Sequence, residues 1–466
     1  MDDQVEHIPI TTEEAVEAVL NGAWLYRADI PDIRALVEGV QMRSPGEDVS
    51  HSNRGVHCYW SRIAKSACSD LSVRVPIDFS NSVFDDVSES GPLKTVPDDG
   101  ARGIDFSGAQ FAGYADFTGV TFTLGCDFSG AQFAVGTRFL GAVFKSEADF
   151  GHTGFGRGCD FGSCQFSAAA RFLGAEFAHD VAFIDAKFAQ QALFGKAAFS
   201  GPASFDSVTF SGVAMFPLVA FQQRVSFARA NVCTAMTFFM SRISGGLDLD
   251  GIRFELGSRV SFQDIDLRPG GKIELTIDQI GRRGKKLIEG EDSKEKEKLK
   301  SAAAQYNMLR DNFRTLPSTD EEEDRCHYKY MDLRRRASDW RWPKRFADWF
   351  FLKWCWGYGI YTHRTIISIL LVILGFGLIY YASAGPETIR NYYMTPIGLD
   401  AEATPVTTER ETNFNPWYFS IITFTTIGYG DYAPLGWLRW VAGLEGLTGL
   451  FLMAVFTVSF ARKFIR

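Results

Sequence analysis

The chain has 466 residues, of which 46% are hydrophobic, and a net charge of −8. This length is too great for one compact core and predicts two to four units, and the modest charge gives no sign of a nucleic-acid partner. No grouping of acids, bases and nucleophiles predicts an enzyme, and no motif predicts a resident cofactor. The composition is unusual in one respect, its 41 phenylalanines.

Residues 1–75 predict a small mixed α cap. Thr11 and Glu14 form a capping box at the start of a first helix, and a second helix is expected from Pro31 to Gly39. The N-terminal stretch is acidic and has none of the apolar core of a signal peptide, so we expect the first two-thirds of the chain to be cytoplasmic. The 8 cysteines show no paired Cys-x-x-Cys spacing, which predicts reduced, mostly buried thiols.

Phenylalanine recurs every 11 residues from Phe106 to Phe238, and a second series, offset by five residues, runs from Phe111 to Phe221. A small or β-branched residue stands two positions before most of these rings, and positions i−2 and i share one face of an extended strand. A fixed short period of this kind predicts stacked units rather than helices. We therefore expect residues 77–280 to form a β-solenoid filled with phenyl rings.

This pattern resembles the pentapeptide-repeat family, whose right-handed, four-sided β-helices use an A(D/N)(L/F)xx unit. The resemblance implies a cytoplasmic right-handed β-solenoid. Spacings of five and six residues alternate here, a departure that predicts coils of 22 residues with bulges at two corners or a changed cross-section. Some members of the family are thought to mimic DNA, but residues 106–267 carry 14 acidic against 11 basic residues, which argues against mimicry. The solenoid is expected to be a scaffold or regulatory domain, and any partner on it is an unidentified protein or ligand.

Residues 281–338 predict a cytoplasmic helical hairpin that links the solenoid to the C-terminal part of the chain. A spacing of three and four from Leu299 to Leu316 gives one apolar seam of the coiled-coil type, in a helix that is capped near Asp292 or Ser293 and ended by Pro317. A second helix with a matching stripe comes next in the chain. The hairpin could transmit force or merely connect, and the sequence leaves both open.

Residues 339–358 are rich in aromatic and basic side chains. Such a segment is typical of an amphipathic helix that lies at the headgroup level of a membrane, with its rings at the interface and its cations toward phosphates. Membrane lipids are therefore expected partners.

Two segments, 366–384 and 440–460, are long and apolar enough to span a membrane. Basic residues cluster before the first and after the second, which predicts that both ends of this pore domain, residues 359–466, face the cytoplasm. A short pore helix is expected over 415–425, between the two spans, because Asn and Pro at its start can cap and begin a helix. The protein is thus expected in the plasma (inner) membrane of a prokaryote, with two transmembrane helices and a re-entrant P-loop.

Residues 425–431 read Thr-Thr-Ile-Gly-Tyr-Gly-Asp. In an ion filter, successive backbone carbonyls point at one axis and replace the ion's hydration shell, which an ordinary strand cannot do because its carbonyls alternate. Gly428 and Gly430 can adopt φ > 0 and so turn alternate carbonyls inward. The motif resembles the signature of potassium channels, with Ile427 where Val is commoner. The resemblance to two-transmembrane potassium channels implies a homotetramer that conducts K⁺ past Thr426, Ile427, Gly428, Tyr429 and Gly430.

The residues beside the filter are expected to support it. Thr425 precedes it, and Asp431 resembles the aspartate that braces such filters against an aromatic side chain of the pore helix. Trp417 and Tyr418 are both candidates for that partner.

Two residues of the second span are candidates for gating. Glu445 is its one acid, and an intramembrane charge usually faces a partner, so Glu445 predicts either a structural hydrogen bond or pH-sensitive gating. Gly449 either packs against a neighbouring helix or resembles the hinge glycine at which inner helices bend.

The leading hypothesis is a tetrameric potassium-selective channel with the β-solenoid as its regulatory or scaffold domain. A weakly selective cation channel of the same architecture and a membrane-anchored interaction scaffold are the alternatives. The gating stimulus is not predicted, because no nucleotide-binding, calcium-binding or voltage-sensing motif is recognised.

Overall fold

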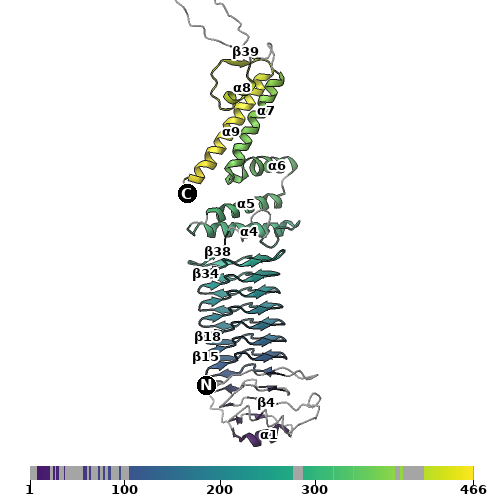
Figure 1. The fold of residues 1–466 in the computed structure, drawn as a ribbon, viewed down its shortest axis with the longest axis vertical. Coiled ribbons are helices and arrows are strands. Elements are labelled where there is room, and N and C mark those ends of the chain that lie inside the picture. Colours follow the sequence, from purple (N-terminus) through teal and green to yellow (C-terminus); the bar gives the residue numbers. More distant parts are fainter. Residues whose placement is uncertain are drawn as a thin grey trace, which may run out of the picture. The chain divides into compact units, whose positions relative to one another are not determined.

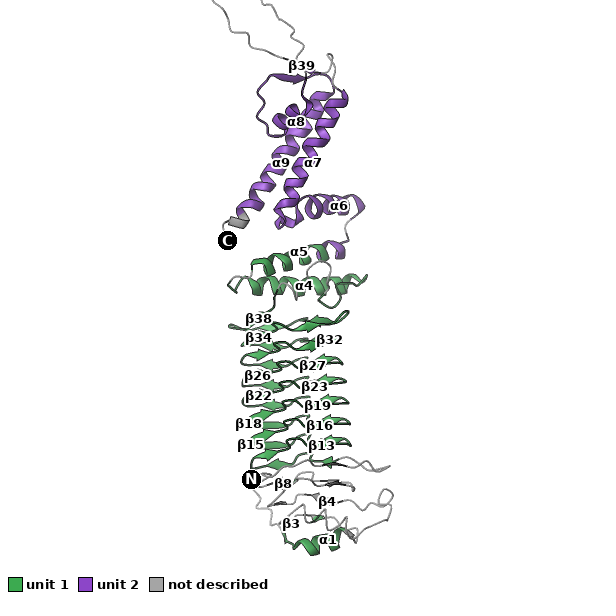
Figure 2. Cartoon of the chain, viewed as in Figure 1, with its two compact units in different colours: residues 1–333 green, residues 334–466 purple. Residues whose placement is uncertain are grey.

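The chain divides into two compact units, residues 1–333 and 334–466 (Figure 2). The computed structural model describes residues 8–20, 25–26, 28–30, 36, 56–59, 62–63, 72–73, 77–78, 82–84, 94–95, 104–276, 287–317, 320–339, 341–383, 389–391 and 414–464.

Unit 1 is a β-solenoid of short parallel strands stacked coil upon coil (Figure 1), with about eight turns over residues 104–274. From β10 onward most strands pair with the strand 22 residues further on: Ile104 is the partner of Cys126, and Phe111 that of Phe133. This register confirms the predicted 22-residue coil. Toward the C-terminal end the coils lengthen, since Met236 pairs with Val260 and Leu247 with Ile273.

The strands form three parallel sheets that wrap the four sides of the solenoid. One side is an 11-stranded sheet of β2 (Leu25–Tyr26), β4 (Val56–Tyr59), β7 (Ile77–Asp78), β10 (Ile104–Asp105), β14 (Cys126–Asp127), β17 (Ala148–Asp149), β20 (Ala170–Arg171), β24 (Ala192–Leu193), β28 (Ala214–Met215), β32 (Ala235–Thr237) and β36 (Arg259–Ser261). A second side is a 9-stranded sheet of β6 (Ser72–Val73), β9 (Lys94–Thr95), β13 (Thr121–Phe122), β16 (Val143–Phe144), β19 (Gln165–Phe166), β23 (Lys187–Phe188), β27 (Thr209–Phe210), β31 (Asn231–Val232) and β35 (Arg253–Phe254).

The remaining two sides form one 18-stranded sheet, because the seven-residue strands β15 and β18 run along both. Its strands are β1 (Ile8–Pro9), β3 (Ala28–Ile30), β5 (Arg62–Ile63), β8 (Val83–Phe84), β11 (Gln110–Phe111), β12 (Ala115–Asp116), β15 (Gln132–Arg138), β18 (Gly154–Asp160), β21 (Glu176–Phe177), β22 (Val181–Ala182), β25 (Ala198–Phe199), β26 (Ala203–Ser204), β29 (Ala220–Phe221), β30 (Val225–Ser226), β33 (Arg242–Ile243), β34 (Gly246–Asp248), β37 (Asp266–Leu267) and β38 (Lys272–Glu274).

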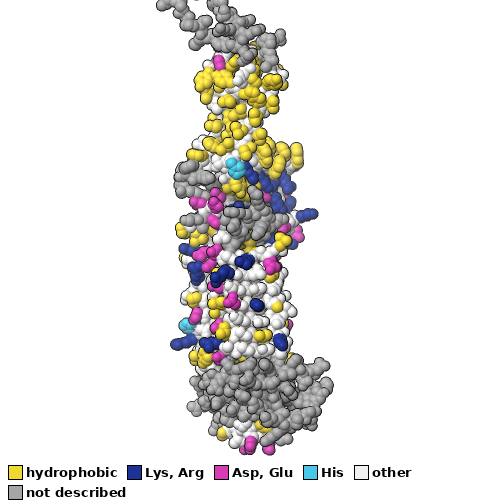
Figure 3. All heavy atoms as spheres, in the orientation of Figure 1, with side chains coloured by type: hydrophobic (Ala, Val, Ile, Leu, Met, Phe, Trp, Pro, Cys, Tyr) yellow, Lys and Arg dark blue, Asp and Glu magenta, His cyan; other side chains and the backbone are white. Residues whose placement is uncertain are grey.

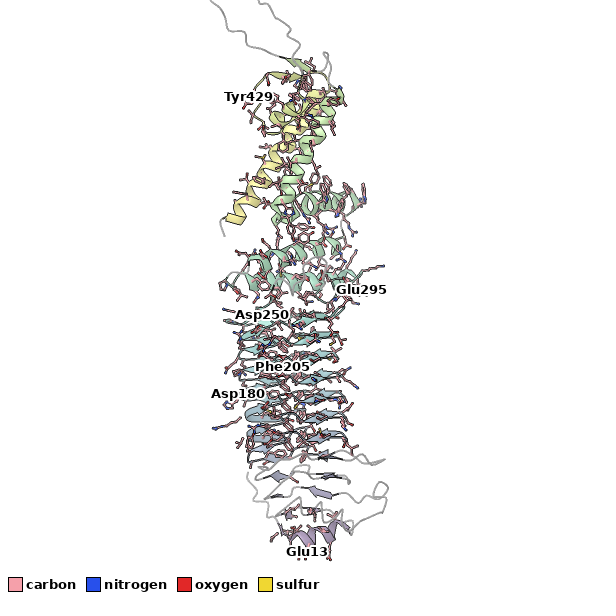
Figure 4. The ribbon with its side chains drawn as sticks, viewed as in Figure 1. Glu13, Asp180, Phe205, Asp250, Glu295 and Tyr429 are labelled. Atoms are coloured by element: carbon pink, nitrogen blue, oxygen red, sulfur yellow. The ribbon has the colours of Figure 1, made fainter. Side chains whose placement is uncertain are left out.

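Phenyl rings fill the interior in columns that run along the solenoid. Phe205 is fully buried within the stack (Figure 4), and its ring stacks face to face on Phe183 and Phe227 with centroids 4.8 Å apart. This separation is the spacing of neighbouring strands in a sheet, so the backbone ladder sets the ring stack. Between columns the rings meet edge to face, as Phe194 does with Phe205 at 5.5 Å and 88°, which is the other favoured aromatic geometry.

The alternation of five and six residues arises at the corners. Between Phe106 and Phe111 the chain makes a tight β-turn, in which Ala109 N–H donates to the Phe106 carbonyl (3.0 Å) and Gly108 has a φ of 65°. The Asp105 carboxylate accepts a hydrogen bond from Ser107 N–H (2.8 Å) and braces this turn. The next corner, before β12, has one residue more. Two of the four corners in each coil are therefore longer by one residue, which accounts for the 22-residue coil.

The strand pairing extends further toward the N-terminus than the boundary predicted at residue 77. β1 pairs in parallel with β3, β3 pairs with β5, and β5 pairs with β8 of the same sheet. Leu25, Ala28 and Ile30 are buried here, and because these side chains are not phenylalanines the repeat was not visible in the sequence. The predicted mixed α cap over residues 1–75 is therefore largely strand where it is described.

One helix, α1 (Thr12–Leu20), interrupts these first strands. Its predicted capping box is confirmed: Thr11 N–H donates to the Glu14 carboxylate (2.9 Å) and Glu14 N–H donates to the Thr11 hydroxyl (3.3 Å). The second helix predicted from Pro31 to Gly39 lies outside the described residues except for Leu36, which is buried.

Helix α4 (Lys296–Phe313) packs against β38 at the C-terminal end of the solenoid. Gln305 Oε1 accepts a hydrogen bond from Phe262 N–H (2.8 Å). Asn312 accepts one from Ile273 N–H (2.9 Å) and donates one to the Ile273 carbonyl (2.7 Å). Two side-chain amides thus replace the strand that a further coil would supply, which closes a sheet edge that would otherwise be open.

The helix-hairpin prediction needs two corrections. α4 begins at Lys296 rather than near Asp292 and ends at Phe313, before Pro317. Its predicted coiled-coil seam is buried. The helix that carries this seam covers the last coil of the solenoid, because the backbone N–H and carbonyl groups at that edge need hydrogen-bond partners.

The second helix of the hairpin, α5 (Asp320–Ala337), is joined to α4 by charged side chains. Glu291 is buried and accepts hydrogen bonds from the Tyr306 hydroxyl (2.9 Å) and from Lys329 Nζ. Burial, and then the charge of Glu291, raise the pKa of Tyr306 well above its ordinary value, so its hydroxyl remains a donor. Arg314 on the loop pairs with Glu323 (2.8 Å).

Six cysteines between Cys126 and Cys355 are free, and five of them are buried, as predicted from their spacing. Burial raises the pKa of Cys126 and of Cys159 well above the ordinary value. Because the thiolate is the reactive form, these thiols act as small apolar fillers of the solenoid.

Unit 2 is helical. It contains α6 (Trp342–Ala347), a π-helix (Asp348–Cys355), a 3₁₀ turn (Gly357–Gly359), α7 (Thr362–Ser383), α8 (Pro416–Phe424), α9 (Leu438–Phe464) and a two-stranded antiparallel ribbon of β39 (Ile389–Asn391) and β40 (Tyr432–Pro434).

α7, α8 and α9 pack on one another, around a core that includes Tyr380, Phe419 and Leu438. α7 over Thr362–Ser383 and α9 over Leu438–Ala461 are apolar and long enough to span a membrane, close to the predicted segments 366–384 and 440–460. Hydrophobic side chains cover much of the visible surface of this unit (Figure 3), as expected of a protein whose helices face lipid.

Replacing Phe205 by alanine tests the phenyl columns. The change leaves a cavity between Phe183 and Phe227 and is expected to cost about 3–5 kcal/mol. Hydrogen exchange of the coils on either side should become faster by roughly 100-fold or more. Leu256→Ala is the control, since Leu256 is fully exposed, and its exchange pattern should match the wild type. Equal effects of the two changes would contradict the packing described.

Replacing Asn312 by leucine tests the closure of the solenoid. The change keeps the branched shape of the side chain but leaves the Ile273 N–H and carbonyl unpaired, and each buried unpaired group costs about 1–3 kcal/mol. Exchange of the Ile273 amide and proteolysis near β38 should both accelerate. Asn307→Leu on the same helix is the control, because Asn307 bonds only with Asp311 at 3.3 Å on the exposed side. An unchanged Ile273 amide in Asn312→Leu would show that the amide does not close the edge.

Candidate functional site

The short helix α8 is positioned by its first residues. The side chain of Asn415 accepts hydrogen bonds from the N–H groups of Trp417 and Tyr418, both at 3.1 Å, and Pro416 occupies the first turn. Both features were predicted and are confirmed. α8 ends at Phe424, and Thr425 is its C-terminal cap.

The backbone after α8 alternates in handedness. Thr426, Gly428 and Gly430 have φ values of 55°, 52° and 77°, whereas Ile427 and Tyr429 lie between them with ordinary negative φ. Such alternation turns successive carbonyls toward the same side of the chain, which a regular strand cannot do. The positive φ of the two glycines was predicted. That of Thr426 was not, and it costs about 1 kcal/mol or more in a residue with a Cβ.

This loop is exposed in the single chain. Ile427 is 55% and Tyr429 70% exposed, and Tyr429 lies on the outside of unit 2 (Figure 4). A Cβ built at Gly428 or Gly430 would meet no atom of this chain within 4 Å. The two glycines are therefore required by the backbone conformation and not by crowding within the chain.

The two aromatic residues of α8 that were considered as partners of Asp431 have different neighbours. The carboxyl of Asp431 interacts with the hydroxyl of Tyr418, while its Oδ1 is buried and has no hydrogen-bond partner among the described residues. Trp417 packs on α7, where a Cβ at Gly377 would lie 2.5 Å from its ring. Of the two partners considered for Asp431, Tyr418 is therefore the one beside it.

Glu445 of α9 is fully buried. It accepts hydrogen bonds from the Tyr380 hydroxyl on α7 (2.7 Å) and from the Ser420 hydroxyl on α8. Ser420 also donates to the Ile373 carbonyl (2.9 Å) in α7. One carboxyl thus joins all three helices. Tyr380 and Ser420 were not identified from the sequence, although polar residues in apolar segments are themselves a signal of such contacts.

Gly449 faces the end of α8. A Cβ at this position would overlap the carbonyl oxygen of Phe424, whereas one at Gly443 would meet no atom of the chain within 4 Å. The close approach of α9 to the end of α8 therefore requires a glycine at 449. This contact is the packing role considered for Gly449, and a hinge at this residue stays a prediction.

A contact at the other end of α9 was not foreseen. The indole N–H of Trp356 donates to the Ser459 hydroxyl (2.8 Å). Arg364 in the first turn of α7 donates to the Lys353 carbonyl (3.1 Å). The segment before α7 is thus attached to both long helices.

Comparison with known families agrees with these two units. Residues 368–466 match a family model described as "Ion channel", and residues 106–154 and 117–165 match one described as "Pentapeptide repeats (9 copies)". No curated protein and no solved structure shows a significant match. The chain therefore combines two known types of domain. It carries an ion-channel domain at its C-terminus and a pentapeptide-repeat β-solenoid domain before it, and the channel domain marks a transporter rather than an enzyme.

Gly449→Ala tests the contact between α9 and the pore helix. The methyl group cannot fit beside the Phe424 carbonyl without moving α8, and such overpacking costs about 1–3 kcal/mol. We expect a lower unfolding temperature of the purified protein and reduced ion flux in proteoliposomes. Gly443→Ala is the matched control, for which the higher helix propensity of alanine predicts equal or greater stability. If both variants behave alike, the close contact at 449 is not needed.

Proposed function

We propose that four copies of this chain form a potassium-selective channel in which residues 426–430 line the ion path. The observation that carries the proposal is the left-handed backbone at Thr426, Gly428 and Gly430, directly after a helix packed between two candidate membrane spans. Carbonyls that point to one side can form a ring that replaces the hydration shell of an ion. Ile427 and Tyr429 then point away from the ion path.

One chain cannot form this path. Irregular backbone at membrane depth is tolerated only where protein or a water-filled cavity surrounds it, and here Ile427 and Tyr429 are more than half exposed. Neighbouring copies would cover both side chains. Assembly by four copies follows the resemblance to two-transmembrane potassium channels, as do the right-handed coil of the solenoid and the re-entrant course of the loop.

The supporting residues have distinct roles in this proposal. Asp431 and Tyr418 brace the outer end of the filter, and Trp417 fixes the pore helix against α7. Thr425 ends the pore helix and lets the chain turn into the filter. Glu445 and Gly449 hold α9 against that helix, so the filter is supported from two sides.

The arrangement in the cell follows from the charge distribution. Basic residues before α7 and after α9 support an orientation with both ends of the pore domain on the cytoplasmic side. The solenoid then lies in the cytoplasm of the cell, attached to an inner-membrane channel as its regulatory or scaffold domain.

Gly428→Ala tests the filter directly. Alanine at a φ of 52° is strained, so the carbonyls should leave the ion path, and we expect loss of potassium current or of selectivity. The matched control is Gly436→Ala, since Gly436 has a similar φ of 54° and equally open surroundings but lies outside the filter. The measurement is the reversal potential of full-length protein in planar bilayers with opposed K⁺ and Na⁺ gradients.

The wild-type reversal potential also separates the alternatives. A value near the potassium equilibrium potential supports the proposal. A value near zero would instead indicate a weakly selective cation channel. No current from correctly assembled protein would favour a membrane-anchored scaffold, and unchanged permeation in Gly428→Ala would refute the filter assignment.

A further inference from the structure

The segment before α7 carries a row of exposed aromatic rings. Trp342, Phe346, Phe350 and Trp354 stack in order, with centroids 5.9, 6.2 and 5.8 Å apart. Their side chains are 77%, 50%, 36% and 47% exposed. A continuous apolar surface of this size on a soluble face would be unfavourable, so its position in the molecule requires an explanation.

The change of helix type keeps this row straight. Positions four apart drift around an α-helix in one direction, and the wider turn of a π-helix reverses that drift. The π-helix from Asp348 to Cys355 directly follows α6, so the rings before and after the junction remain aligned. π-helical segments are rare and frequently lie at functional sites.

Cations lie on another side of the same segment. Arg341, Lys344 and Arg345 are exposed, and their spacing of three and four places them on one face. Residues 334–356 contain seven Lys and Arg against two Asp, a net charge of +5. Asp348 interacts with Arg335 and Lys344, whereas Arg341 and Arg345 have no acidic partner in the described part of the chain.

The segment is held at the ends of both spans. Lys353 accepts a hydrogen bond from Arg364 in the first turn of α7, and Ser368 of α7 donates to the Cys355 carbonyl (3.4 Å). Trp356 donates to Ser459, near the C-terminal end of α9. Because α7 and α9 are the two candidate membrane helices, these contacts place the segment where the hydrocarbon ends and the headgroups begin.

We propose that Arg341, Lys344 and Arg345 form a binding site for the phosphate groups of anionic phospholipids, beside an aromatic row seated in the same leaflet. Guanidinium groups bind phosphate through paired hydrogen bonds, and each cation close to an anionic leaflet strengthens binding by about fivefold. The inference requires that α7 and α9 cross a membrane. It does not require potassium selectivity.

The test is the lipid selectivity of the full-length protein in phosphatidylcholine vesicles, measured by electron paramagnetic resonance with spin-labelled phosphatidylglycerol and spin-labelled phosphatidylcholine. We expect the wild type to associate at least about threefold more strongly with the anionic lipid. The triple change Arg341→Gln, Lys344→Gln, Arg345→Gln should bring this ratio close to one, and 1 M KCl should lower it in the wild type because salt screens exposed charges.

Two further variants guard against nonspecific effects. The control Lys145→Gln, Lys187→Gln, Arg253→Gln removes the same charge from exposed positions of the solenoid and should leave the ratio unchanged. The conservative change Arg341→Lys, Arg345→Lys retains the charge and should keep most of the preference. A wild-type ratio near one, or a preference that survives the triple change, would overturn the proposal. The readout does not involve ion current, so this inference and the channel proposal can fail separately.

Discussion

Both units depend on one constraint, which is that a backbone N–H or carbonyl group needs a hydrogen-bond partner. In the solenoid each strand bonds to the coils on either side, and only the terminal coils leave groups without partners. α4 solves this problem at the C-terminal end with the amides of Gln305 and Asn312. In the loop after α8 the residues of positive φ instead alternate along the chain, so the backbone there follows no regular ladder. The edge of the solenoid is thus closed by side-chain amides, whereas the loop after α8 has no such ladder, although backbone groups need hydrogen-bond partners in both places.

Helix α8 is held by three contacts of different kinds. Trp417 fits against α7 only because Gly377 has no side chain, and α9 approaches Phe424 only because residue 449 is glycine. Between these two contacts the carboxyl of Glu445 joins Tyr380 and Ser420. Close backbone approach through small residues is the usual way in which helices associate in a membrane, and a buried carboxyl adds a directional bond. These contacts therefore hold the C-terminal end of α8, where the loop begins, against α7 and α9.

The sequence predicted what is periodic or locally determined, and it failed where a contact joins distant segments. The 11-residue Phe period was sufficient for the 22-residue coil, and Asn415 with Pro416 for the start of α8. The first strands were missed because Leu25 and Ile30 fill the interior there in place of phenylalanine. Gln305 and Asn312 resemble ordinary polar residues of a helix surface, so only the fold reveals them as substitutes for a strand. The π-helix and the bond from Trp356 to Ser459 have no recognisable sequence signal.

α9 is attached to other elements in two places along its length. Its first half contacts α8 through Glu445 and Gly449. Its last turns are bound to the segment before α7 through Ser459. The stretch between residues 449 and 459 therefore lies between two points of attachment, one on α8 and one on the segment before α7.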